Sequence, residues 1–262
     1  MSNLVEKYRD LKKRGEKITA LTAYDYPTAR LLDESGIDII LVGDSLGMVV
    51  LGYEDTTQVT LEEMLHHTRA AARGIKKALL VGDMPIHTFD TPDEAVATAK
   101  KFVDAGAQAV KLEGGVSHVA HIEAITRAGI PFMAHIGMLP QQVREQGGYK
   151  VKGKTQSEAD ALIADARAVE NSGAFSVVLE IVVPEIAKQI TNAIGIPTIG
   201  IGSGDSCDGQ ILVTHDLIGF FPWFTPKFVS AEAEVAAEIR RASRAFIERT
   251  RGHAALSKRS ED

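Results

Sequence analysis

Short apolar runs alternate along the chain with longer segments whose apolar residues recur every three or four positions. A short apolar run predicts a strand that is buried on both faces, and the longer pattern predicts an amphipathic helix. The strands expected from this pattern cover residues 18–22, 37–42, 78–81, 108–113, 131–136, 175–181, 196–202 and 210–214.

Capping signals mark where the intervening helices begin and end. Thr60 with Glu63 three residues later has the pattern of a capping box, and Thr91 precedes a proline at a first helical position. Glycines such as Gly36 follow the helical pattern, as expected for C-caps. The expected helices cover residues 3–14, 26–35, 60–73, 91–105, 117–128, 157–172, 184–194 and 230–249.

Regular alternation of strands and helices indicates an α/β protein with a parallel sheet. Eight such units predict a single (β/α)8 TIM barrel, here with an extra N-terminal helix. The rival is an open doubly wound sheet, which would carry a Gly-x-Gly-x-x-Gly turn after its first strand, whereas residues 24–27 read Tyr-Asp-Tyr-Pro. We therefore predict one barrel domain over residues 1–250 and a disordered polar tail over residues 251–262.

The composition argues against several classes of partner and location. A net charge of −6 predicts no nucleic-acid partner and no attraction to an anionic membrane surface. No apolar run approaches the ~20 residues that a membrane-spanning helix needs, and the first residues lack a signal-peptide pattern. Cys207 is the one cysteine, which excludes an internal disulfide. We therefore expect a cytoplasmic protein.

Acidic residues stand at the ends of four predicted strands. The sequence Leu-Val-Gly-Asp occurs twice, ending in Asp44 and in Asp83, and two further strands end in Glu113 and Glu180. The carboxyl ends of the strands of a barrel meet at one face, which carries the active site. The four acids are therefore predicted to form one oxygen-rich site, although they lie far apart in the sequence.

Three other side chains are placed at the same strand ends. Ser45 follows Asp44, and Lys111 lies two residues before Glu113, so Lys111 and Glu113 point to the same face of their strand. His135 ends the fifth predicted strand, where contact with a substrate and a role in fixing its neighbours are both open. We count Asp44 and His135 among the candidate substrate contacts.

This set of side chains favours chemistry on an α-keto acid. The carboxylates of Asp44, Asp83 and Glu113 are hard oxygen ligands that suit Mg²⁺. Glu180 would remain available as a general base, because a carboxylate in a dry site has a raised pKa. Lys111 would neutralise a substrate carboxylate or a developing enolate. The site thus predicts Mg²⁺-assisted enolisation followed by formation or cleavage of a C–C bond.

Other polar patterns are weaker. The glycine-rich residues 200–204 lack the pattern of a P-loop, so a tight turn is favoured over a phosphate site. The pairs His66 with His67 and His118 with His121 have no acidic third ligand nearby in the sequence. These histidines are therefore expected on solvated helix faces rather than in metal sites.

Seven segments, spread in order over most of the chain, resemble the ketopantoate hydroxymethyltransferase family. The two most specific are LVGDSLGM and VKLEGG, whereas the glycine turns alone would be unspecific. The segments are residues 18–25, 41–48 (LVGDSLGM), 110–115 (VKLEGG), 147–151 (GGYKV), 199–204 (IGIGSG), 208–213 (DGQILV) and 226–228 (PKF).

The resemblance implies a barrel of the phosphoenolpyruvate/pyruvate type, a homo-oligomer that is commonly a decamer, and a one-carbon transfer. The donor would be 5,10-methylenetetrahydrofolate, the acceptor 3-methyl-2-oxobutanoate and the product 2-dehydropantoate. Ser203 departs from the family pattern, which usually has alanine there. By position, the resemblance assigns Mg²⁺ binding to Asp44, Asp83 and Glu113, keto-acid contacts to Ser45, Asp83 and Lys111, and the proton acceptor to Glu180.

Two alternatives rank lower. A Mg²⁺-dependent C–C lyase of the isocitrate-lyase type would carry a Lys-Lys-Cys-Gly-His run, which is missing. A catalytically silent barrel that serves as a binding module should have lost some of the site acids, and this chain keeps all four.

Overall fold

The computed structural model describes residues 2–257 of the chain. The chain divides into two compact units, Met1–Leu212 and Val213–Asp262, and each is described by itself. All eight strands lie in the first unit, so the barrel ends at Leu212, short of the boundary predicted at residue 250. No helix of the described part is long and apolar enough to cross a membrane.

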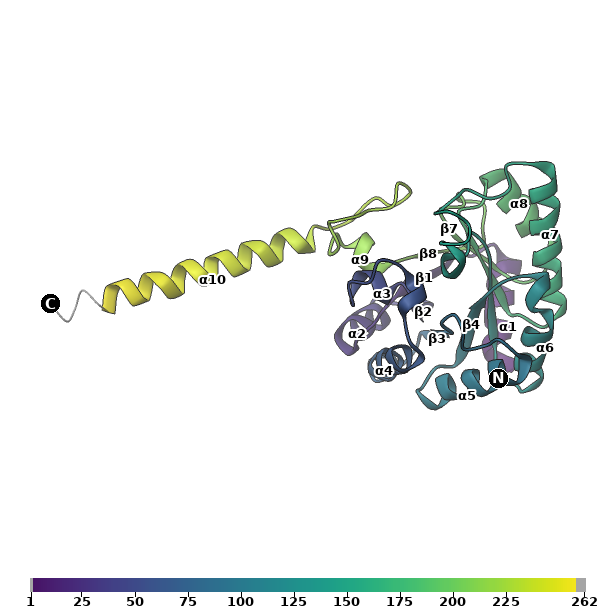
Figure 1. Cartoon of the computed structure of the whole chain (residues 1–262), viewed down its shortest axis with the longest axis horizontal. Helices are drawn as coiled ribbons and strands as arrows, with labels where there is room; N and C mark the ends of the chain where they lie inside the picture. Colours follow the sequence, from purple (N-terminus) through teal and green to yellow (C-terminus); the bar gives the residue numbers. More distant parts are fainter. Residues whose placement is uncertain (1, 258–262) are drawn as a thin grey trace. The chain divides into compact units, whose positions relative to one another are not determined.

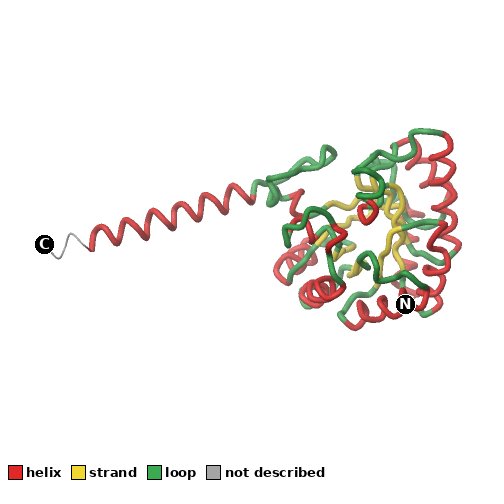
Figure 2. Tube along the Cα trace, viewed as in Figure 1, coloured by secondary structure: helices red, strands yellow, loops and turns green. Residues whose placement is uncertain are grey.

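The first unit is a closed barrel in which every strand pairs in parallel with its neighbours in chain order and β8 pairs with β1 (Figures 1 and 2). This arrangement confirms the predicted (β/α)8 class. The strands are β1 Ile18–Thr22, β2 Ile39–Val42, β3 Leu79–Asp83, β4 Ala109–Glu113, β5 Phe132–Gly137, β6 Ser176–Glu180, β7 Thr198–Ile201 and β8 Gly209–Leu212.

Helices surround the strands (Figure 2). Four of the eight α-helices of this unit begin at a side-chain cap, which is Asp25, Thr60, Thr91 or Thr155. The predicted capping box is present at Thr60 with Glu63, and the helix start predicted at Thr91 also forms a capping box, with Glu94. Residues 202–208, between β7 and β8, contain no helix, so this unit departs from strict alternation. The α-helices of the first unit are α1 Ser2–Arg14, α2 Tyr26–Ser35, α3 Leu46–Val49, α4 Leu61–Ala72, α5 Pro92–Asp104, α6 Val119–Arg127, α7 Gln156–Asn171 and α8 Pro184–Ala193. Its 3₁₀ helices are η1 Thr56–Gln58, η2 Val116–His118 and η3 Pro140–Gln142.

Two apolar clusters hold the barrel together. One lies between the strands and the surrounding helices, and the other combines inward-facing strand residues such as Met133 with Tyr8 and Leu11 of α1. Tyr8 donates a hydrogen bond to the carbonyl of Asp38 (2.8 Å) and its ring lies 5.9 Å from that of Phe175. The predicted N-terminal helix therefore plugs one end of the barrel, which leaves the opposite end for chemistry.

The second unit contains the short helix α9 Thr214–Leu217 and the long helix α10 Val235–Ser257. The backbone N–H of Glu232 donates to the carbonyl of Leu217 (2.7 Å) and links the two segments. Helix α10 extends through residues 251–257, which were predicted to belong to a disordered tail. The remainder of the predicted tail, residues 258–262, lies outside the described residues.

Candidate active site

The four predicted acids stand at the carboxyl ends of β2, β3, β4 and β6. Asp44 lies two residues beyond β2, while Asp83, Glu113 and Glu180 are the last residues of their strands. Asp44, Asp83 and Glu113 are almost fully buried, and the side chain of Glu180 is 14% exposed. Parallel pairing puts Asp83 opposite Lys111, which sets the acid ends of β3 and β4 side by side.

Lys111 is the cation of this cluster. Its ammonium lies 2.7 Å from Asp83 Oδ1, and both side chains are nearly inaccessible to solvent. Burial alone would lower the pKa of Lys111, but the surrounding carboxylates, Asp83 and Glu113 foremost, raise it above the ordinary value. Lys111 therefore stays charged, and it is available to pair with an anionic ligand group.

Asp44 is held by hydrogen bonds from two directions. Its backbone N–H donates to Asp83 Oδ2 (3.3 Å), and its carboxylate accepts from the side-chain amide of Gln141 (2.9 Å). Burial, followed by the negative charge of Asp83, raises the pKa of Asp44 to about 7. The cluster thus carries more negative charge than one lysine offsets.

Gln141 links two of the strand ends through the long loop after β5. Besides Asp44, its amide nitrogen donates to the carbonyl of Met84 (3.0 Å), and its backbone N–H donates to Glu113 Oε2 (3.0 Å). The side chain is buried in η3. Sequence reasoning missed Gln141, because nothing in the order of residues distinguishes it from its neighbour Gln142.

His135 lies between two of the acids. Its Nδ1 is 3.7 Å from Glu113 Oε1 and its Nε2 is 3.2 Å from Glu180 Oε2. Burial, reinforced by the charge of Lys111, holds the pKa of His135 well below its usual range, so the ring is neutral. Burial also raises the pKa of Glu113 well above its ordinary value and the pKa of Glu180 to about 7. With a pKa of about 7, Glu180 can accept a proton near neutral pH.

Ser45, the remaining predicted contact, and two polar residues that follow β7 lie in different settings. The hydroxyl of Ser45 is 2.9 Å from that of Tyr24, at the end of β2. Ser203 is fully buried and bonds to the backbone beside Glu180, whereas Asp205 is exposed. Asp205, which also stands at a strand end in the sequence, is therefore not part of the cluster.

The loop between β5 and α7 contacts the loop between β2 and α4 above the strand ends. Arg144 Nε lies 2.6 Å from Asp55 Oδ2, which ties the two loops together. Burial and the negative charges of Glu180 and Asp44 raise the pKa of Tyr149 above its ordinary value, and its hydroxyl lies 3.9 Å from Met48 Sδ. The loop from Gly137 to Lys154 thus contributes side chains to the site.

The donor set fits a divalent cation that keeps part of its water. Among residues 2–257 no three His, Cys, Asp or Glu side chains are close enough to hold a metal ion together. Mg²⁺, however, commonly takes one or two carboxylates and fills the remaining positions with water and substrate oxygens. Glu113 Oε1 is buried and has no hydrogen bond within the described structure, and the excess negative charge raises the pKa of Asp44. Both observations suit an added positive charge.

The histidine pairs do not form sites of this kind. The rings of His118 and His121 are 5.2 Å apart and those of His66 and His67 are 5.3 Å apart, without an acidic third ligand at metal distance in the described structure. His67 Nδ1 lies 2.6 Å from the carbonyl of Tyr24, so this ring contacts the loop between β1 and α2 instead of facing only solvent as predicted.

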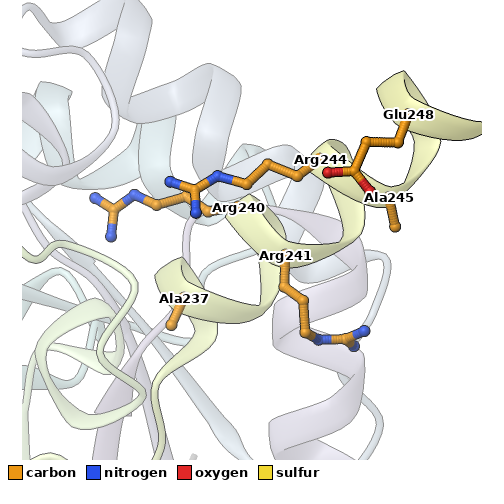
Figure 3. A pocket seen from close by; sticks show the side chains of 6 residues that line it. All are labelled: Ala237, Arg240, Arg241, Arg244, Ala245 and Glu248. Atoms are coloured by element: carbon orange, nitrogen blue, oxygen red, sulfur yellow. The ribbon is translucent and has the colours of Figure 1, made fainter. Parts of the chain in front are cut away.

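A hollow of about 410 Å³ lies along α10 (Figure 3). All its lining residues come from this helix, three of them arginines and one a glutamate, with Ala237 and Ala245 between them. A space between side chains of one helix offers no converging set of acids and bases. The strand ends of the barrel are therefore the candidate active site.

The model of the family described as ketopantoate hydroxymethyltransferase matches residues 3–254. The chain belongs to the ketopantoate hydroxymethyltransferase family. Relatives of this family include the 3-methyl-2-oxobutanoate hydroxymethyltransferase of Clostridium novyi, 52% identical over 249 residues, which are 94% of this chain and 90% of the relative. The enzyme of the same name from Ignicoccus hospitalis is 51% identical over 250 residues, 95% of this chain and 93% of the relative.

Solved structures of other proteins share the fold of this family member. A phosphonopyruvate hydrolase complex with oxalate and Mg²⁺ superposes with a TM-score of 0.61 at 14% identity, covering 81% of each chain. A 2,3-dimethylmalate lyase, a member of the PEP mutase/isocitrate lyase superfamily, gives 0.60 at 16% identity over 95% of this chain and 88% of the other. At such identities these likenesses show the fold alone, and they agree with the predicted (β/α)8 barrel.

Proposed function

We propose that this protein transfers a hydroxymethyl group from 5,10-methylenetetrahydrofolate to 3-methyl-2-oxobutanoate, giving 2-dehydropantoate for pantothenate biosynthesis. Membership of the family supports the reaction, and the names of relatives about half identical over nearly the whole chain support the substrate. The observation that carries the proposal is the pairing, at one barrel end, of an acid with a pKa near 7 and a buried lysine.

Glu180 is the proposed base. Its carboxylate removes the proton from C3 of the keto acid, and a pKa of about 7 makes it a far better acceptor than an exposed glutamate would be. Neutral His135, 3.2 Å away, limits where the Glu180 carboxylate can lie. The site is nearly closed to solvent, so water does not compete for the enolate carbon.

Lys111 and Ser45 are the proposed contacts of the substrate carboxylate and keto group. Lys111 is charged and held by Asp83, and Ser45 offers a hydroxyl beside that of Tyr24. Positive charge and hydroxyl donors stabilise the oxygen on which negative charge develops when C3 loses its proton.

Mg²⁺ is the proposed cofactor, with Asp44, Asp83 and Glu113 as the residues that would hold it, some of them through water. When bound, it would supply a positive charge next to the keto oxygen and favour enolisation. The presence of all four acids, with the lysine between them, also argues against a silent binding module.

Lyase chemistry is not proposed. The 2,3-dimethylmalate lyase is similar at 16% identity and shows only the fold, while the two relatives at 51% and 52% identity carry one name. From the resemblance we also propose a homodecamer, which sedimentation velocity measures directly, and a cytoplasmic location.

The test is to incubate the protein with 3-methyl-2-oxobutanoate, methylenetetrahydrofolate and Mg²⁺ and to follow 2-dehydropantoate by mass spectrometry. Exchange of the C3 hydrogen with deuterated water, measured without folate, isolates the first step. Glu180→Gln should abolish this exchange while the keto acid still binds. Asp44→Ala should abolish activity and the dependence of the exchange on Mg²⁺. Product formation by Glu180→Gln at the wild-type rate would contradict the assignment of the base.

A further inference from the structure

The chain leaves β6 through a strained turn directly after Glu180. Ile181 has a φ of +49°, in the left-handed region, which a β-branched residue rarely adopts. Strain of this kind persists only where neighbouring groups hold the backbone in place. The contacts that hold this turn therefore bear on where the Glu180 side chain points.

Ser203, from the glycine-rich turn after β7, bridges the two sides of this turn. Its hydroxyl donates to the carbonyl of Leu179 (2.7 Å) and accepts from the backbone N–H of Val182 (3.0 Å). Leu179 and Val182 flank the pair formed by Glu180 and Ile181. Ser203 itself is fully buried, so water cannot replace its hydroxyl in either bond.

The remaining ties of the turn are backbone to backbone. The N–H of Ile181 donates to the carbonyl of Ile201 (2.9 Å), and the carbonyl of Ile181 accepts from the N–H of Lys152 (2.9 Å). The carbonyl of Glu180 accepts from the N–H of Met138 (2.8 Å). Ser203 adds a side-chain bridge to this framework, and it is the contact that a substitution can remove without breaking the sheet.

We infer that Ser203 is a positioning residue that fixes the backbone of Glu180 through hydrogen bonds to Leu179 and Val182. This inference rests on the proposed role of Glu180 as the base. The hydroxyl touches neither substrate nor the reacting atoms, and it acts by holding the carboxylate at the orientation needed to reach C3. Geometry of this kind determines the rate of the chemical step more than it determines binding.

The sequence makes the test practicable. Ser203→Ala deletes one buried oxygen and adds no atom, so it introduces no steric clash and the variant should fold. A matched control lies on the same strand as Glu180. Ser176 is also buried, but its hydroxyl has no hydrogen bond within the described structure, so Ser176→Ala removes a hydroxyl without breaking a tie.

The experiment compares wild type, Ser203→Ala and Ser176→Ala in steady-state hydroxymethyl transfer. Ser203→Ala should lower kcat roughly three- to tenfold with KM for the keto acid within about twofold, because positioning of a base affects the reaction step. Ser176→Ala should match the wild type. Three results would overturn the inference. They are an unchanged kcat in Ser203→Ala, an equal fall in kcat in Ser176→Ala, and a rise in KM without a fall in kcat.

Hydrogen–deuterium exchange of the unliganded proteins gives a second readout that needs no activity. In Ser203→Ala the amide of Val182 should exchange at least about tenfold faster than in the wild type, since it loses its hydrogen bond, while Ser176→Ala should leave it protected. Equal protection of Val182 in all three proteins would overturn the bridge. A wild type that forms no product would instead refute the proposed function, and the amide exchange would still decide the role of Ser203 in the turn.

Discussion

Glu180→Gln should stabilise the protein, and the stabilisation should grow with pH. Glutamine has the shape of a protonated glutamic acid but cannot ionise. The side chain of Glu180 is 14% exposed, and burial raises its pKa from the ordinary 4.5 to about 7. Ionisation of Glu180 is therefore more costly in the folded protein than in the unfolded chain.

The sign and size follow from proton linkage. Between pH 4.5 and 7 the folded state binds the proton of Glu180 more tightly than the unfolded chain does, so this group lowers the free energy of unfolding as pH rises. The stability that protonated Glu180 contributes is fully present below the pKa of the unfolded chain, and it is lost as the pH rises through the pKa of the folded protein. With this shift, the free energy of unfolding of Glu180→Gln should exceed that of the wild type by about 3 kcal/mol at pH 8 and by about 1 kcal/mol at pH 5.

Urea unfolding with EDTA, at one protein concentration and at both pH values, measures the difference between variant and wild type. EDTA is needed because a bound cation would favour the ionised carboxylates. Distant groups titrate alike in both proteins and cancel in the difference. The charge of Glu180 also raises the pKa of Asp44 and of Glu113, so the difference reports Glu180 together with its coupling to these two acids. Glu185→Gln removes the same charge from an exposed position on the first turn of α8 and serves as the control for loss of a surface carboxylate.

A difference between Glu180→Gln and wild type that stays constant from pH 5 to pH 8 would refute the reasoning. Destabilisation at pH 8 would refute it more strongly, because it would mean that ionised Glu180 is held by favourable contacts. In that case the pKa of Glu180 would lie below the value that a base at neutral pH requires.

Two further substitutions test how the loop after β5 supports the site. Gln141→Leu removes the amide from the Asp44 carboxylate and should lower the free energy of unfolding by about 2 kcal/mol in urea, and a loss below about 0.5 kcal/mol would show that water replaces the amide. Gly137→Ala would put a Cβ 2.4 Å from the Glu180 carbonyl and should slow C3 exchange at least tenfold. The control Gly148→Ala, which is also at positive φ but in open space, should leave C3 exchange unchanged. Equal effects of the two substitutions would mean that backbone strain alone is responsible.

Local signals in the sequence were sufficient for most elements. The strand predicted over residues 18–22 and the helix over 26–35 have the same bounds in the structure, and both predicted N-caps at Thr60 and Thr91 are present. Periodicity and capping act over a few residues, so they can be interpreted without knowledge of the fold. Short elements such as α3, with four residues, and η3, with three, were missed because they are too short to show a hydrophobic period.

The sequence by itself determined that acids would gather at one end of a parallel barrel, because parallel strands all end on the same side. It could not determine that Gln141 reaches Asp44 across 97 positions, or that Ser203 bridges the turn beside Glu180. Those contacts depend on register and on how the loops fold over the strand ends. Burial also decided the protonation of the site: the closed barrel removes water from Asp44 and Glu180 and raises their pKa values to about 7, with the charge of Asp83 adding to the rise at Asp44.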